Sequence, residues 1–191
     1  MPERIAPLDP IYQLKITLLG VRPAIWRRVL IPAKFRLIKV HKIIQMAMGW
    51  QDYHLHQFVI GGMRYSYPYP GTDWEDSGDI STRNLRARDM WSRRGIVVEY
   101  VYDFGDNWRH SVVLERILPA KPYGVYPVCL AGARACPPED VGGAGGYREF
   151  LDVLRRPKHP DHEHYATWSG GSFNPNLFDL VRVSRKVARI R

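Results

Sequence analysis

Two short stretches of this chain carry more ionisable side chains than their local structure requires. His54 and His56 are separated by one residue, and a later turn holds Asp103, Asp106 and His110. In a regular strand, residues i and i+2 lie on the same face, roughly 7 Å apart along the strand. This spacing allows both imidazoles to bind one metal ion, with Asp103, Asp106 and His110 as candidate further ligands.

The turn also permits two other interpretations. A carboxylate beside an imidazole can act as a general acid or base, so Asp103, Asp106 and His110 are candidate catalytic residues together with the two earlier histidines. A purely structural turn needs only Gly105 and polar residues that bond their own backbone, with Asp103 paired to Arg109. The residue types leave these alternatives open. We predict that the five ionisable side chains converge on one side of a sheet.

Hydrophobic periodicity predicts the elements that must position these residues. Alternating apolar residues predict strands over residues 11–19, 24–31, 54–60, 96–101 and 111–118. Apolar residues at helical spacing predict helices over residues 37–48, 147–155 and 159–168. Residues 68–94, with a short helix near 84–91, and residues 119–138 are expected to be irregular.

Strands and helices are mixed without a regular β-α-β alternation, and the connections between neighbouring strands are short. This pattern predicts a single α+β domain over residues 11–180, a mostly antiparallel sheet with helices packed on it. Residues 1–10 are expected to form an N-terminal tail, and residues 181–191 a basic C-terminal tail. In the second strand, Arg27 and Arg28 are both expected to face water.

The charge of the chain favours an anionic partner. Lys and Arg number 28 against 19 Asp and Glu, a formal net charge of +9, and nucleic acid is the first partner to consider. Candidate phosphate contacts are Arg93, Arg94, Arg185 and Lys186, which lie in basic clusters. The alternative is a solvated loop and a solvated tail, and no helix-turn-helix, zinc-finger or RNA-recognition signature accompanies the clusters.

The cysteine content and the hydropathy of the chain argue against several classes of protein. Cys129 and Cys136 are the only cysteines, so there is no disulfide framework, and their separation is not that of a zinc ribbon. The Gly-rich residues 142–146 lack the Gly-Lys-Ser/Thr of a phosphate-binding loop. The N-terminus lacks the apolar core of a signal peptide, and no apolar run approaches ~18 residues. We therefore expect a cytoplasmic protein without membrane contact; the patterns point to no particular cofactor or protein partner.

Several blocks, taken in order, carry a resemblance to one family. They are Trp26-Arg27-Arg28, Ala47-Met48-Gly49-Trp50, His54-Leu55-His56-Gln57-Phe58, the whole of residues 102–110, residues 136–143, Gly146-Tyr147 and Phe178-Asp179. The chain resembles the Ri-plasmid open-reading-frame-three-like family, also named for insertion-element passenger proteins of TnpR type, from about residue 12 to residue 180.

This resemblance implies an α+β fold and an association with plasmids and mobile elements, but it assigns no activity and no residue roles. We see no serine- or tyrosine-recombinase constellation. The combined prediction is a plasmid- or mobile-element-associated binding or accessory protein with an anionic partner such as nucleic acid. The alternative is a metal-dependent or acid/base enzyme that uses His54, His56 and the hairpin of Asp103 and His110.

Overall fold

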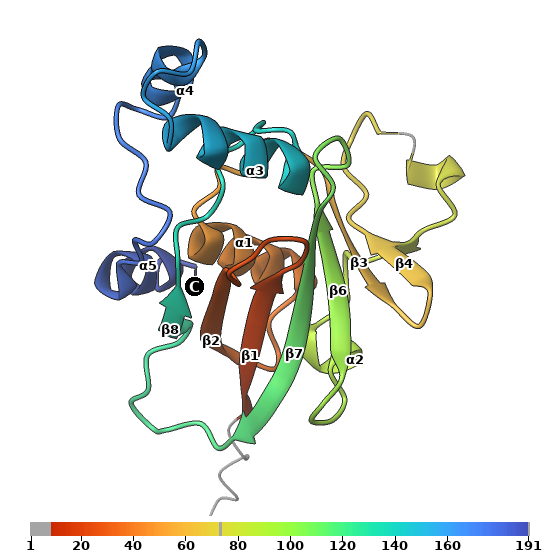
Figure 1. Ribbon diagram of the computed structural model, residues 1–191. Helices are drawn as coiled ribbons and strands as arrows, with labels where there is room; N and C mark the ends of the chain where they lie inside the picture. The colour runs from red at the N-terminus through yellow and green to blue at the C-terminus, as the bar shows by residue number, and fades with distance from the viewer. Residues whose placement is uncertain (1–8, 73, 191) are drawn as a thin grey trace, which may run out of the picture.

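Eight strands form one sheet in the computed structural model, which describes residues 9–72 and 74–190 (Figure 1). In chain order the strands are β1 (Ile11–Leu18), β2 (Trp26–Pro32), β3 (His56–Ile60), β4 (Met63–Ser66), β5 (Ile80–Ser81), β6 (Val97–Tyr102), β7 (Trp108–Leu118) and β8 (Val128–Ala133). Their order across the sheet is β5-β4-β3-β6-β7-β1-β2-β8. All neighbours are antiparallel except the short β4–β5 pair. The predicted single α+β domain with a mostly antiparallel sheet is confirmed.

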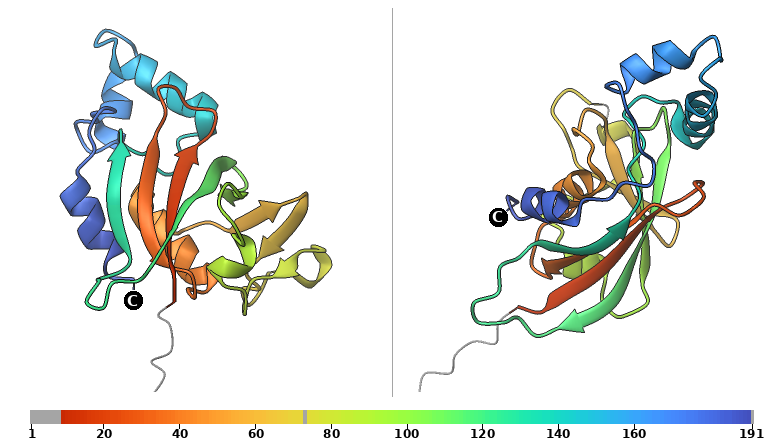
Figure 2. Two further views of the ribbon diagram at one scale, coloured as in Figure 1. Left: turned by 90° about the horizontal axis from the view of Figure 1, so that it is seen from below. Right: turned by 60° about the vertical axis from the view of Figure 1, so that its left-hand side comes forward.

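The helices gather on one side of the sheet and at one end of it. They are α1 (Leu37–Met48), α2 (Ala87–Met90), α3 (Gly143–Leu154), α4 (His162–Trp168) and α5 (Leu180–Val187), with a 3-10 turn, η1 (Trp74–Asp76). Figure 2 shows α1 and α5 on the same side of the sheet. The predicted bounds of α1 are confirmed, and its stripe of Leu37, Val40, Ile44 and Met48 is buried.

One charged side chain belongs to the inner face of the sheet. The expectation that Arg27 faces water is wrong, because alternation along β2 turns Arg28 outward and its neighbour inward, where Arg27 is only 2% exposed. Its guanidinium donates to the carbonyl of Ala47 at the end of α1, 2.7 Å away. It also donates to the carbonyls of Ala133 and Arg134 at the end of β8, each 2.9 Å away. Arg27 therefore joins α1, β2 and β8.

Three segments differ from the prediction. Strand β8 lies inside residues 119–138, which were expected to be irregular. The prolines near it favoured that expectation, but β8 is a short edge strand that pairs with β2. Helix α3 begins at Gly143, within the glycine run, instead of at Tyr147. Helix α5 occupies the start of the predicted C-terminal tail and buries Val187. Most of the predicted N-terminal tail, residues 1–8, lies outside the described residues, as does Arg191.

None of the helices in the described ranges combines the length and the apolar character needed to cross a membrane.

Candidate metal centre

His54 lies in the loop between α1 and β3. The strand begins only at His56, so the expectation that His54 and His56 share one strand face is wrong. The residues between α1 and β3 form the turn that leads the chain out of α1, and Asp52 in this turn is in the left-handed region at φ 64°. The loop is fastened to the end of β6 by the backbone N–H of Asp103, which donates to the carbonyl of Leu55 at 2.9 Å. This bond brings the His54 loop beside the hairpin turn.

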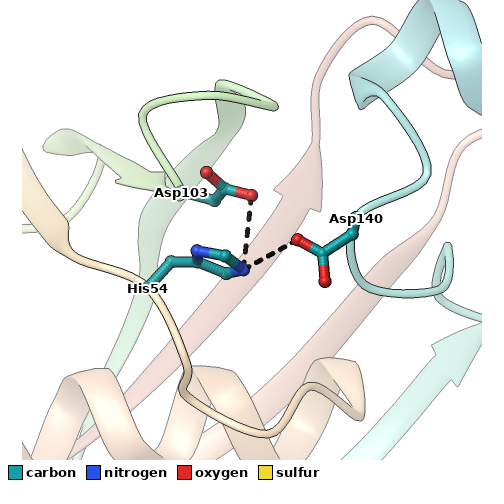
Figure 3. Close-up of side chains that lie close together, drawn as sticks. All are labelled: His54, Asp103 and Asp140. Atoms are coloured by element: carbon teal, nitrogen blue, oxygen red, sulfur yellow. Dashed lines mark ion pairs between the residues drawn. The ribbon is translucent and has the colours of Figure 1, made fainter.

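His54 meets one carboxylate from the turn and a second from a distant loop. Its Nε2 lies 3.0 Å from Oδ1 of Asp140 and 3.7 Å from Oδ2 of Asp103 (Figure 3). One ligand atom from each residue lies within 4.8 Å of the other two. Asp103 is buried, whereas the Asp140 side chain is 65% exposed. The cluster is therefore anchored on one side and open to solvent on the other.

Backbone hydrogen bonds hold the Asp103 carboxylate in place. Its Oδ1 accepts from the N–H groups of Gly105 and Asp106, at 2.9 and 3.3 Å, which leaves Oδ2 directed at the imidazole. The proposed pairing of Asp103 with Arg109 is wrong. Arg109 instead forms a bidentate ion pair with Glu99, across the pairing of β6 with β7. The side chain of Arg109 lies on the outward face of β7, where Glu99 is its partner.

The loop that carries Asp140 is fixed from both sides. The carboxylate of Asp106 accepts from the N–H of Gly142 at 3.2 Å, and Glu139 accepts from the N–H of Gln51 at 2.7 Å. Asp106 therefore positions the loop and does not point at the imidazole. Burial raises the pKa of the Glu139 carboxyl. Asp140 was not among the predicted site residues; the block of residues 136–143 was its only signal.

Glycines in the same loop allow its close approach to the hairpin. A side chain at Gly143 would collide with the backbone carbonyl of Asp106, and one at Gly146 would collide with that of Val141. Gly143 therefore allows the close contact with the turn, and Gly146 allows the close contact with Val141. Nearby, Cys136 and Cys129 are free thiols, and burial raises the pKa of each.

His56 lies in the core instead of the cluster. Its ring stacks on His41, with centroids 3.5 Å apart and planes 6° apart. His41 is in turn bonded to Asp52 and to the hydroxyl of Tyr100, at 2.7 and 2.8 Å. Burial lowers the pKa of His56 well below its ordinary value, so this imidazole is neutral. The His41 network was not predicted, because His41 was counted only as part of the apolar stripe.

His110 is also a core residue. It is completely buried, its Nδ1 lies 3.2 Å from the carbonyl of Tyr100, and its ring meets Trp50 edge-on at 5.3 Å. Burial lowers the pKa of His110 to about 4. Of the five predicted residues, the structure thus brings His54 and Asp103 together, and places the other three in different surroundings.

The buried His110 predicts a loss of stability in acid. The unfolded chain binds a proton at this residue near pH 6.5, whereas the folded chain does so only near pH 4. Its contribution is therefore full above pH 6.5 and is lost as pH falls toward 4, by about 3 kcal/mol in total. Urea unfolding at pH 7 and pH 4.5 measures the loss. His110→Gln should reduce it and the exposed control His164→Gln should not; equal losses in all three proteins would contradict the assignment.

A groove of about 580 Å³ is lined at one place by Asp140 of the His54–Asp103–Asp140 cluster and its neighbour Glu139. Asp179, Arg182 and Lys186, at the start of α5 and on it, also line the groove. Tyr53, beside His54 in the chain, lines the groove too and is 68% exposed. Of the four predicted phosphate contacts, only Lys186 lines this groove.

The predicted phosphate contacts do not line one common hollow. Arg94 lines a hollow of about 970 Å³ together with Arg28, Arg116, the Glu115 carboxylate that pairs with Arg28, and other residues of β1, β7 and β8. Arg93 is exposed in the loop before β6, and Arg185 is exposed on α5.

Comparison with known proteins shows that most of this chain matches one family. The family model described as plasmid pRiA4b ORF-3-like protein matches residues 10–182. Uncharacterized protein y4hQ of Sinorhizobium fredii is 38% identical over 164 residues, which cover 85% of this chain and 82% of that protein. The crystal structure of a protein of unknown function, MM3350 from Methanosarcina mazei Go1, is similar with a TM-score of 0.82 and 37% identity, over 93% of this chain and 99% of that one.

Proposed function

We propose that this chain, which belongs to the family of plasmid pRiA4b ORF-3-like proteins, binds a divalent metal ion through His54, Asp103 and Asp140 and uses it for hydrolysis. The observation that carries the proposal is the approach of three ligand atoms to within 4.8 Å of one another. They come from the α1–β3 loop, the β6–β7 turn and the loop before α3. Three blocks that carry the family resemblance therefore meet at this point.

The ligand set favours a particular group of ions. One imidazole nitrogen and two carboxylates suit Zn²⁺, Mn²⁺ and similar divalent ions, which accept mixed nitrogen and oxygen donors. Three protein ligands leave a position for water, as in catalytic zinc sites. A bound ion lowers the pKa of that water and makes hydroxide available at neutral pH. The exposure of Asp140 supports access of water and substrate to the open side.

Metal titration tests the proposal directly. Protein stripped with EDTA is titrated with Mn²⁺ and Zn²⁺ by calorimetry, and we expect one ion to bind per chain. Water-proton relaxation with Mn²⁺ then reports whether the bound ion keeps exchangeable water, which the open position requires. Absence of saturable binding at millimolar metal would reject the site, and a bound ion without water would reject the hydrolytic role.

A second candidate function is binding of single-stranded nucleic acid on the outer sheet face. The observation that favours it is the hollow containing Arg28, Arg94 and Arg116. Beside it, Trp26 offers an aromatic ring with Lys15 and Arg28 within 5.5 Å of its centroid. Cations beside a partly exposed ring suit phosphate contact combined with base stacking.

The salt dependence of oligonucleotide binding distinguishes this second function from a basic surface that has no nucleic-acid partner. Binding of a fluorescent oligonucleotide should weaken steeply as salt rises, since each neutralised phosphate releases counterions. Arg93→Ala with Arg94→Ala should lower the affinity for all sequences alike and reduce the salt slope by about 0.7 for each phosphate that is no longer neutralised. No binding at low salt would leave the charge as a solubility feature.

A further inference from the structure

We propose that the groove between the metal cluster and α5 binds a nucleoside phosphate, with its phosphates between the metal ion and the cations of Arg182 and Lys186. The inference rests on the proposed function, because the metal ion supplies one end of the site. It adds the class of ligand, which the cluster alone does not specify. The groove volume of about 580 Å³ lies within the usual range for small-molecule sites.

The first argument is the pair of cations on α5. Arg182 and Lys186 are four residues apart, so they lie one above the other on the same face of the helix, and both line the groove. Within the described chain, neither side chain forms an ion pair or a hydrogen bond. The nearest carboxylate along the helix, Asp179, accepts from the backbone N–H of Arg182 as the helix N-cap. Asp179 also lines the groove, but its carboxylate makes no ion pair with either side chain within the described residues. Two adjacent cations without a salt-bridge partner are suited to a phosphate group.

The second argument is the charge of the Glu139–Asp140 segment of the groove. Glu139 and Asp140 would repel a phosphate if the cluster held no ion. A divalent ion at Asp140 reverses this effect, and its open positions can accept phosphate oxygens. The metal ion and the two cations of α5 then attract the same anion, and Asp179 is the remaining carboxylate of the lining. Metal and nucleotide binding should consequently strengthen each other by the same factor.

The third argument is the aromatic character of the groove. Tyr53 and Trp168 are 68% and 43% exposed and line the groove, and Phe173 contributes to its lining. Exposed aromatic residues in a groove that also contains cations provide stacking surfaces for a base, which a purely phosphate-binding site does not need. A nucleotide uses both features at once, so we infer this ligand in preference to inorganic phosphate.

Fluorescence titration with the methylanthraniloyl derivative of ADP tests the groove in the presence of Mn²⁺. Arg182→Ala with Lys186→Ala should weaken binding at least about tenfold, the effect of losing charge-assisted hydrogen bonds. The matched control is Arg148→Ala with Arg189→Ala, which removes the same charge from exposed residues that do not line the groove. That control should change the affinity by less than about threefold, because it removes exposed, solvent-screened charges that do not line the groove.

Competitors and metal dependence complete the test. Unlabelled ADP should displace the probe better than either pyrophosphate or adenosine, and EDTA should weaken binding. If Mn²⁺ binds in the separate titration but the nucleotide does not, the groove inference is wrong and the metal site stands. If Mn²⁺ itself fails to bind, both the metal site and the groove inference are wrong. Equal weakening in the two double variants, or displacement by pyrophosphate as good as that by ADP, would also overturn the nucleotide assignment.

Discussion

Replacing Arg27 with alanine is expected to lower the free energy of unfolding by about 3–5 kcal/mol, the cost of breaking a buried charged network. The guanidinium has only carbonyl oxygens as hydrogen-bond partners within the described chain, from residues 26, 47, 133 and 134. It also lies 4.5 Å from the centre of the Phe178 ring. Alanine would leave several buried carbonyls without a donor and would open a cavity between α1 and β8.

The neighbouring arginine provides the matched control. Arg28 pairs with Glu115 at 2.6 Å, but both side chains are partly exposed, so Arg28→Ala should cost no more than about 1 kcal/mol. Arg27→Lys should remain strongly destabilising, because one ammonium group cannot replace a planar fork of donors. Urea unfolding at pH 7 measures all three variants. A loss below about 1 kcal/mol for Arg27→Ala would show that water replaces the guanidinium at little cost.

Removal of one cluster residue is expected to reduce metal affinity by more than about 100-fold, since even residues that only orient metal ligands contribute 10–100-fold. Asp140→Asn gives the cleanest test, because this side chain is exposed and its replacement keeps the shape of the loop. His54→Ala should have a similar effect. Asp103→Asn is less informative, because Asp103 also holds the β6–β7 turn.

Controls separate metal binding from folding. Glu163→Gln and His164→Ala change exposed residues of the same chemical types on α4 and should leave metal affinity unchanged. The urea midpoint of Asp140→Asn without metal should equal that of the original protein. Unchanged Mn²⁺ affinity in Asp140→Asn would remove this residue from the site, and unfolding in His54→Ala would indicate a structural role for the imidazole.

The elements with strong local periodicity were predictable from the sequence. The apolar stripe of α1 and the alternation in β1, β2, β6 and β7 identified these elements with small errors at their ends. Arg27 was misplaced because its partners come from residues 47, 133 and 134, which no local pattern connects to it. Alternation alone indicates two faces of a strand, but it does not say which face will be covered.

The candidate site was only partly predictable for the same reason. His54 and Asp103 could be singled out, because histidines and carboxylates were more numerous than a loop and a turn require. His56 was grouped with His54 because a regular strand was assumed through residue 54, whereas the chain is still leaving α1 there. Asp140 reaches the site through the bonds that Asp106 and Glu139 make to distant backbone. Such contacts between separate loops follow from tertiary packing and leave little trace in local spacing.

The position of β1 inside the sheet has a consequence for folding while the protein is being synthesised on the ribosome. β1 pairs with β2 on one edge and with β7 on the other, and Ile11 lies opposite Leu118. The hairpin of β1 and β2 can form early, but the other edge of β1 has no partner until β7 has been made, about 76–86 residues after the end of β2. At roughly 5–20 residues per second, synthesis of that stretch takes on the order of 4–17 seconds. During this time the nascent chain carries an unpaired apolar edge, so the first half of the protein depends on its second half for protection from aggregation.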